Sequence, residues 1–148
     1  MAATTIHPVR FQDWEEKMNI LVILAHPDDP EFFMGGTLAL WSQLGHKISY
    51  LLLTKGERGV SEQFPDGEAL KEIRKIEQRN AADVLGVGPV DFLDHQDGLL
   101  EVNLENRRQL VAEIRKRQPD IVVSSGPQTY FHTHYINHPD HRAAGLLT

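Results

Sequence analysis

Mostly apolar runs alternate with amphipathic segments along this chain. Four short runs rich in Ile, Leu and Val are typical of strands covered on both faces of a sheet; they span residues 19–25, 47–54, 90–93 and 120–124. Apolar residues recur at helical spacing in the segments between and after them, which span residues 35–44, 66–86, 104–118 and 139–148. Strands that alternate with helices need crossover connections, so the pattern predicts a three-layer, Rossmann-like α/β domain with a mostly parallel sheet.

The same pattern suggests the limits of the domain. Residues 1–18 have no clear period and are expected to form an N-terminal leader, whereas residues 19–148 form one domain without an internal linker. A length of 148 residues fits one ordinary domain with one core. The last ten residues begin a helix that has no cap and no strand after it, so we expect the C-terminal part of the fold to be absent.

Charge and composition narrow the class of partner. A net charge of -6 and a pI near 5.7 argue against nucleic-acid binding, which needs a basic face. The longest apolar run, residues 20–25, is far shorter than the roughly 20 residues of a membrane span, so we expect no membrane partner and a cytoplasmic location. The densest basic cluster falls on a predicted helix and is expected to be a solvated face; it comprises Arg107, Arg108, Arg115, Lys116 and Arg117. The oligomeric state stays open, and a homo-oligomer is compatible with the sequence.

A polar cluster, His26-Pro27-Asp28-Asp29, follows the first predicted strand directly. The proline stiffens the turn and holds its side chains in fixed directions. Adjacent carboxylates repel unless a positive charge lies beside them, and a divalent metal supplies that charge. One aspartate can then bind the metal with His26 while the other acts as a base on water. The alternative is a turn in which the aspartates only cap the following helix.

A second cluster holds four of the eight histidines within ten residues: His132, His134, His138 and His141. Proline at 139 suits the first position of a helix that is capped by Asn137 or His138. His138 and His141 are then three residues apart and point into one cavity from successive turns. Asp140 can orient one imidazole by accepting its second N–H.

The fold predicts that the two clusters meet. Ligands bind at the carboxyl ends of parallel strands, so both clusters line one crevice if the strands at 19–25 and 120–124 are neighbours. The chain has no cysteine, so any metal must use histidine and carboxylate ligands. Two imidazole nitrogens and one carboxylate oxygen, with a fourth position left for water, describe a catalytic zinc site.

Several motifs together resemble the LmbE-like, or PIG-L, family of deacetylases. They are AHPDD at 25–29 with Glu31, GGT at 35–37, TKGERG at 54–59, RKIEQRNAADVLG at 74–86 and HPDHRAAG at 138–145. The resemblance implies a zinc hydrolase that removes an acetyl group from an N-acetylated amino sugar or a related small molecule. Members of this family are usually longer, so the resemblance also implies that the C-terminal part of the family domain is absent here.

The resemblance assigns roles residue by residue. His26, Asp29 and His141 match the zinc ligands, and Asp28 matches the general base that takes a proton from water. His138 matches the group that stabilises the oxyanion and protonates the amine, with Asp140 supporting the histidines. Two further positions, Arg74 and Asp97, match residues that hold the sugar. No motif position corresponds to His132 or His134, which are expected in a lid or on the surface.

Three other functions are compatible with parts of the sequence. Gly35 and Gly36 at a helix N-terminus could bind a nucleotide or sugar phosphate without chemistry, although a full G-x-G-x-x-G pattern is absent and such a pair more often allows close helix packing. The metal could also serve stability alone in an inactive protein. Metal-dependent phosphoester hydrolysis usually needs two metals and more carboxylates than this crevice offers.

Overall fold

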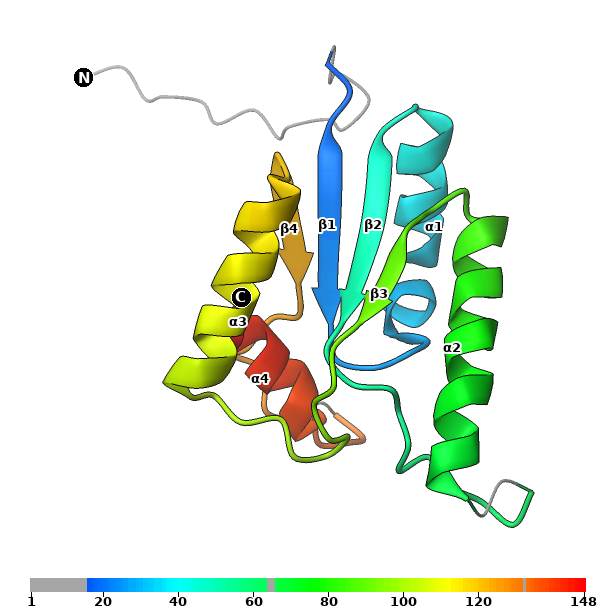
Figure 1. Ribbon diagram of the computed structural model, residues 1–148, viewed down its shortest axis with the longest axis vertical. Coiled ribbons are helices and arrows are strands. Elements are labelled where there is room, and N and C mark those ends of the chain that lie inside the picture. Colours follow the sequence, from blue (N-terminus) through cyan, green and yellow to red (C-terminus); the bar gives the residue numbers. More distant parts are fainter. Residues whose placement is uncertain (1–15, 64–65, 132) are drawn as a thin grey trace.

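The computed structural model of the chain (Figure 1) describes residues 16–63, 66–131 and 133–148. Within them, one sheet is built from four strands: β1 (Asn19–Leu24), β2 (Lys47–Leu52), β3 (Val90–Phe92) and β4 (Ile121–Ser124). Neighbouring strands pair in parallel in the order β3-β2-β1-β4. The predicted parallel sheet is therefore confirmed, and β1 and β4 are direct neighbours.

Helices cover both faces of this sheet. They are α1 (Asp29–Gln43), α2 (Gly67–Val84), α3 (Leu104–Arg117) and α4 (Pro139–Leu147). Figure 1 shows α1 and α2 on one side of the strands and α3 and α4 on the other. The predicted three-layer, Rossmann-like arrangement is confirmed. No described helix has both the length and the apolar character needed to cross a bilayer.

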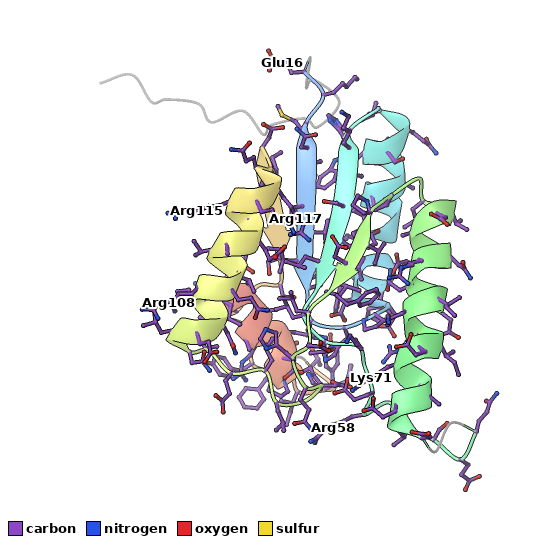
Figure 2. The ribbon with its side chains drawn as sticks, in the orientation of Figure 1. Glu16, Arg58, Lys71, Arg108, Arg115 and Arg117 are labelled. Carbon is purple, nitrogen blue, oxygen red and sulfur yellow. The ribbon has the colours of Figure 1, made fainter. Side chains whose placement is uncertain are left out.

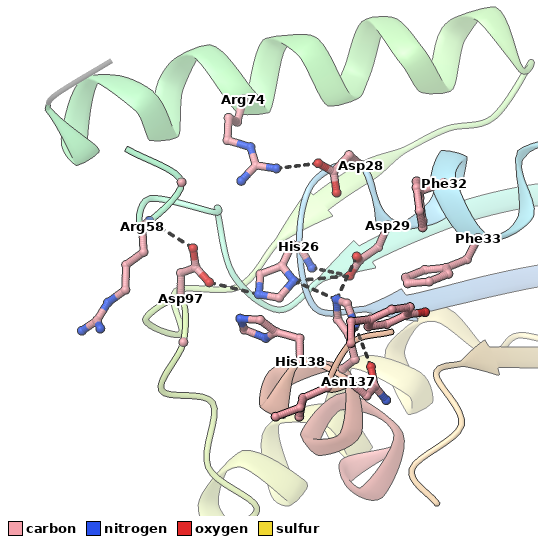
Figure 3. Close-up of a pocket in the computed structure, with 15 residues that line it drawn as sticks. His26, Asp28, Asp29, Phe32, Phe33, Arg58, Arg74, Asp97, Asn137 and His138 are labelled. Carbon is pink, nitrogen blue, oxygen red and sulfur yellow. Dashed lines mark hydrogen bonds and ion pairs between the residues drawn. The ribbon is translucent and has the colours of Figure 1, made fainter. Parts of the chain in front are cut away.

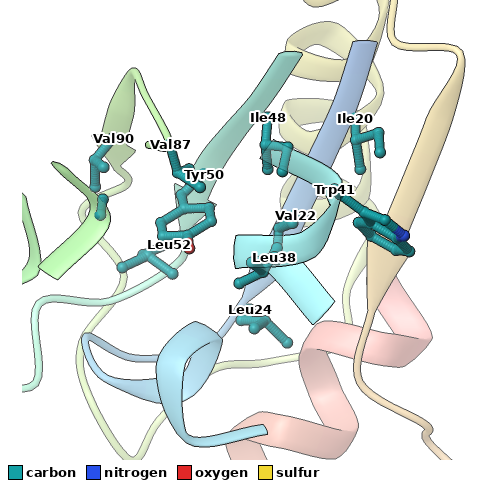
Figure 4. Close-up of a cluster of buried hydrophobic side chains, with 11 residues drawn as sticks. Ile20, Val22, Leu24, Leu38, Trp41, Ile48, Tyr50, Leu52, Val87 and Val90 are labelled. Atoms are coloured by element: carbon teal, nitrogen blue, oxygen red, sulfur yellow. The ribbon is translucent and has the colours of Figure 1, made fainter. Parts of the chain in front are cut away.

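Alternation along β1 divides the core into two clusters. Ile20 and Val22 face one side of the sheet, where they pack with side chains of α1 and α2 (Figure 4). Leu21 and Ile23 face the other side and pack with side chains of α3 and α4. Because every residue from 20 to 25 is buried, the apolar run that predicted this strand serves both faces. Full burial of each large aliphatic side chain contributes about 1.5–3 kcal/mol.

The first helix differs from its prediction. It begins at Asp29 instead of Gly35, and its regular path is interrupted at Met34, whose φ of -148° is not helical. Pro30 favours an early start because its fixed φ suits the first turn of a helix. The predicted segment from Gly35 onward is thus only the second part of α1.

Two sequence expectations concern segments away from the sheet. Only residues 16–18 of the proposed leader are among the described residues, so that boundary stays a prediction. The basic cluster on α3 is mostly exposed, and Arg108 and Arg115 point away from the helix (Figure 2). Arg117 is the exception, since it forms ion pairs with Asp91 at 2.7 Å and with Glu113.

The connections place a crevice at the carboxyl ends of β1 and β4. The chain leaves β1 toward α1 on one face, and it leaves β4 toward α4 on the other face. Such a change of side opens a ligand crevice between neighbouring parallel strands. Gly145 lets α4 approach this edge closely, because a Cβ at this position would overlap the Ser125 carbonyl oxygen.

Candidate active site

The turn after β1 is held by its own side chains. His26 and Asp29 are buried, and Asp29 Oδ2 accepts the backbone N–H of His26 at 2.9 Å. Asp28 occupies the N-cap position of α1 in a left-handed conformation (φ 84°), but its side chain makes no capping hydrogen bond. The alternative of simple helix capping therefore does not account for Asp28, whose carboxylate is left to face the crevice.

The beginning of α4 supplies two more imidazoles. His138 is the N-cap, and its Nδ1 accepts the backbone N–H of Asp140 at 3.2 Å, so the neutral ring carries its proton on Nε2. His141 follows one turn later, with its Nδ1 3.2 Å from Asn137 Oδ1. Because that oxygen can only accept, it fixes a proton on Nδ1, so Nε2, which contacts Asp29 Oδ1, is the ring nitrogen that can bind a metal once it carries no proton.

The two clusters meet around a common point (Figure 3). His26 Nδ1 lies 3.3 Å from His141 Nε2 and 3.5 Å from Asp29 Oδ2, and His141 Nε2 lies 3.1 Å from Asp29 Oδ1. Ligand atoms about 2.1 Å from a tetrahedral zinc ion would be about 3.4 Å apart. These three side chains therefore have the spacing of donors around one metal ion.

Two carboxylates, those of Asp97 and Asp140, face the other ring nitrogen of His26. Its Nε2 lies 3.0 Å from Asp97 Oδ1 and 3.2 Å from Asp140 Oδ2. Asp140 also accepts the backbone N–H groups of Gly98 at 2.7 Å and Leu100 at 3.2 Å, so this fully buried carboxylate is satisfied. Asp140 thus supports His26, whereas the resemblance implied that it would support the pair of His138 and His141.

Charge in the cluster favours a cation at its centre. Burial alone would lower the pKa of His26, but hydrogen bonds with Asp140, Asp29 and Asp97 outweigh burial and raise that pKa to about 11. Burial alone would raise the pKa of Asp29, but hydrogen bonds from His141 and His26 hold it well below its usual range. A divalent cation can supply the same positive charge once His26 gives up its proton.

Several donor sets here could hold a metal. Ligand atoms of His26, His138 and His141 lie within 4.8 Å of one another, as do those of His26, Asp97 and Asp140. The set of His26, Asp29 and His141 offers two imidazoles with one carboxylate, which suits zinc better than magnesium. His138 then remains beside the set, with its ring centroid 4.7 Å from that of His26.

Asp28 lies at the wall of the same cavity. Its carboxylate pairs with the Arg74 guanidinium at 2.9 Å, and its backbone N–H donates to Gln78 Oε1 at 2.6 Å. Arg74 also donates to the carbonyl oxygens of Pro27 and Gly56, at 2.8 and 3.0 Å. The positive charge expected beside the two aspartates is thus partly supplied by Arg74.

These residues line a cavity of about 800 Å³, which is large enough for a small molecule. The two sugar-binding candidates, Arg74 and Asp97, both lie in its wall, but Arg74 holds the turn after β1 and Asp97 is turned toward His26. Their contact with a sugar stays a prediction. His134 is exposed and lies outside the cavity wall, and His132 lies outside the described residues.

The sequence did not reveal several supporting groups. Gln78 lies on α2, far along the chain from Asp28, and no local pattern links the two. Asn137 was considered only as a helix cap, although its spacing of four residues from His141 is a signal that could have indicated their hydrogen bond. Gly35 and Gly36 are not explained by close packing, because a Cβ at either position would meet nothing within 4 Å.

Comparison with known proteins identifies the family. The model of the PIG-L family, described as GlcNAc-PI de-N-acetylase, matches residues 21–148. The chain belongs to this family. The resemblance drawn from the motifs is therefore confirmed.

Two deacetylases are among the most similar relatives in the PIG-L family. Diacetylchitobiose deacetylase of Thermococcus kodakarensis is 35% identical over 136 residues, which cover 92% of this chain and 49% of the relative. The crystal structure of N,N'-diacetylchitobiose deacetylase from Pyrococcus horikoshii superposes with a TM-score of 0.80 and 36% identity, over 87% of this chain and 47% of that one.

One relative has another activity. A 4-oxalmesaconate hydratase of Pseudomonas putida is 32% identical over 120 residues, which cover 76% of this chain and 46% of the relative. The present chain thus spans about half the length of these relatives.

Proposed function

We propose that this chain is a zinc-dependent N-deacetylase that hydrolyses the acetamide of an N-acetylated amino sugar or a related small molecule. The observation that carries this proposal is that His26 Nδ1 and His141 Nε2 lie 3.3 Å apart and that each lies 3.1 to 3.5 Å from one of the two carboxylate oxygens of Asp29. Membership of the PIG-L family and the similarity to two chitobiose deacetylases support the same reaction.

In this proposal His26, Asp29 and His141 hold the zinc ion. Zinc bound there would polarise the acetyl carbonyl and make a nearby water molecule more acidic. Asp97 and Asp140 hold Nε2 of His26 from behind, which directs Nδ1 toward the ion. Asn137 does the same for His141.

Two further side chains carry the proton transfers. Asp28, which is not needed as a ligand, accepts the proton of the attacking water. His138 stabilises the developing oxyanion with its Nε2–H and then passes this proton to the leaving amine, while the proton that Asp28 took from water is returned to the ring, so that acetate and the amine are released. Burial and the positive charge of the His26 site lower the pKa of His138, which favours the neutral ring whose Nδ1 accepts from Asp140 and whose Nε2 carries the proton.

The remaining parts of the proposal concern the substrate and its setting. The cavity wall beside Arg74 and Asp97 is where we propose that the sugar lies. The partner is a small molecule, and we propose that the reaction takes place in the cytoplasm.

A direct test is an acetate-release screen with the zinc-loaded protein over N-acetylglucosamine derivatives, including N,N'-diacetylchitobiose. We expect acetate and a free amine in equal amounts, loss of both after chelation, and recovery when zinc is added back. Elemental analysis of the same sample should give zinc bound to the chain. Zinc binding without acetate from any derivative would contradict the proposal.

Similarity to a hydratase favours one alternative use of the same site. A base and a cation that activate water could add it to a carbon–carbon double bond as well as to an amide carbonyl. The same preparation should therefore be assayed with 4-oxalmesaconate. Turnover of this compound with no acetate release would replace deacetylation by hydration.

A further inference from the structure

Both polar atoms of the peptide bond between Pro27 and Asp28 are held by side chains of α2. The Arg74 guanidinium donates to the Pro27 carbonyl oxygen at 2.8 Å, and Gln78 Oε1 accepts the Asp28 backbone N–H at 2.6 Å. Arg74 and Gln78 are four residues apart, so they lie on the same face of the helix. This face of α2 therefore fixes the plane of the peptide group that carries Asp28.

Gln78 is itself locked in place. Its side chain is buried, and its Nε2 donates to both carboxylate oxygens of Glu31 at 2.9 Å. The Asp28 N–H needs an acceptor and the Glu31 carboxylate needs a donor, so these two partners decide which end of the amide faces Asp28. The amide cannot turn over without losing all of these hydrogen bonds.

Asp28 needs such support because its backbone is unusual. A positive φ is uncommon for a residue with a side chain, and the φ of Asp28 is 84°. Its carboxylate makes no capping hydrogen bond to α1, so its own helix does not direct it. The clamped peptide and the Arg74 pair are the contacts that aim this carboxylate at the cavity.

We propose that Gln78 is a positioning residue that aims Asp28 for catalysis. The inference rests on the proposed function, in which Asp28 is the general base. Without the Gln78 acceptor, the Asp28 N–H loses its partner, the peptide plane turns and the carboxylate moves away from the reacting water. A displacement of about 1 Å in a catalytic group can cost on the order of 100-fold in rate.

The first test is Gln78→Met in the zinc-loaded protein. Methionine has nearly the same length but offers no strong hydrogen-bond acceptor or donor. We expect kcat to fall roughly 10- to 100-fold with KM and zinc content little changed, because only the alignment of the base is lost. Asn80→Met is the matched control, since it makes a similar change at an exposed position on the same helix and should keep the wild-type kcat.

A swap of two side chains separates positioning from packing. In the double variant Gln78→Glu with Glu31→Gln, the carboxylate introduced at position 78 accepts both from the Asp28 N–H and from the amide introduced at position 31. The hydrogen bonds are then restored with donor and acceptor exchanged. We expect this variant to regain most of the wild-type kcat, whereas Gln78→Glu alone, which sets two carboxylates against each other, does not.

Amide hydrogen exchange at Asp28 gives a readout that does not depend on turnover. Exchange should be slow in the wild-type protein and in the swap variant, and fast in Gln78→Met. Wild-type kcat in Gln78→Met overturns the inference. A swap variant that binds zinc but remains slow also overturns it, and this variant decides the matter if Gln78→Met does not fold. Absence of acetate release from the wild-type protein would instead overturn the proposed function. Slow exchange at Asp28 would still show that Gln78 holds the Asp28 backbone N–H.

Discussion

His26 Nδ1 and His141 Nε2 lie 3.3 Å apart, although the two residues are separated by 115 positions in the sequence. The contact depends on the parallel pairing of β1 with β4, in which Ile20 to Ile23 align with Ile121 to Ser124. Each strand then delivers its following segment to the same edge of the sheet. One imidazole comes from a stiff turn and the other from a helix, so the pair is held from both sides of the crevice.

Replacing His141 should disrupt metal binding. The variant His141→Ala removes one of the three closely spaced donors, and even loss of a hydrogen bond behind a ligand costs roughly 10- to 100-fold in metal affinity. We therefore expect zinc affinity to fall by more than this range in a competition assay with a chelating dye. Thermal stabilisation by zinc should disappear in parallel.

His134→Ala is the matched control for this experiment, because His134 belongs to the same histidine-rich segment but is exposed and outside the cavity. Its zinc affinity should equal that of the wild-type protein. Equal losses in the two variants would mean that zinc binds the histidine-rich segment without the turn after β1.

Regular periodicity explains why the architecture was predictable. The apolar run at 20–25 is buried on both faces of the sheet and matches β1 to within a few residues. The helical spacing at 66–86 matches α2 equally well, because both patterns depend on local sequence. The start of α1 was not predicted, because residues 29–34 do not follow one apolar stripe and three of them, Asp29, Phe32 and Phe33, line the cavity. Phe33, for example, places its ring edge-on to His141 at 5.4 Å.

Residues of the site could be predicted only where they belong to a sequence motif. The meeting of His26 with His141 followed from strand order, since both lie after neighbouring strands. The contact of Asp97 with the sugar stays a prediction, but no motif indicated that its carboxylate also lies 3.0 Å from His26 Nε2. Gln78 could not be found at all, because its link to Asp28 joins two elements 50 residues apart and leaves no spacing in the sequence.

The variant Asp28→Asn should separate turnover from metal binding. Asparagine keeps the shape of the side chain and an oxygen that can accept from Arg74, but it cannot take up the proton of water. We expect kcat for acetate release to fall by roughly 10²- to 10⁴-fold, the usual contribution of a general base. Zinc content from elemental analysis should not change. Full turnover with zinc bound would show that another group accepts the proton.

A change at Asn137 should weaken the metal site without removing a ligand. The variant Asn137→Ala deletes the oxygen that fixes a proton on His141 Nδ1, so the ring can turn or adopt the wrong tautomer. We expect zinc affinity to fall roughly 10- to 100-fold. Asn137→Asp retains the acceptor and should bind zinc more tightly than Asn137→Ala. If both variants bind zinc like the wild-type protein, the hydrogen bond does not orient the ligand.

The pH dependence of stability offers a test away from the crevice. His46 is buried, and its Nδ1 accepts the backbone N–H of Met18 at 3.1 Å, which requires that Nδ1 carry no proton. Burial and the nearby Lys17 lower the pKa of His46 below its ordinary value of 6.5. As pH falls through 6.5, the unfolded chain therefore takes up a proton at His46 that the folded protein does not.

The contribution of His46 to the free energy of unfolding should thus decrease from pH 7 toward pH 5, by at most about 1.4 kcal/mol per pH unit. His46→Asn keeps an acceptor for Met18 but cannot titrate, so the difference in stability between the wild-type protein and this variant should shift in favour of the variant as pH falls. Urea unfolding of both metal-free proteins at pH 7, 6 and 5 measures the difference. His134→Asn, at an exposed position, should keep the wild-type slope. Parallel curves for wild type and His46→Asn would mean that the folded protein takes up a proton at His46 as readily as the unfolded chain, so that the bond from Met18 does not keep the ring neutral.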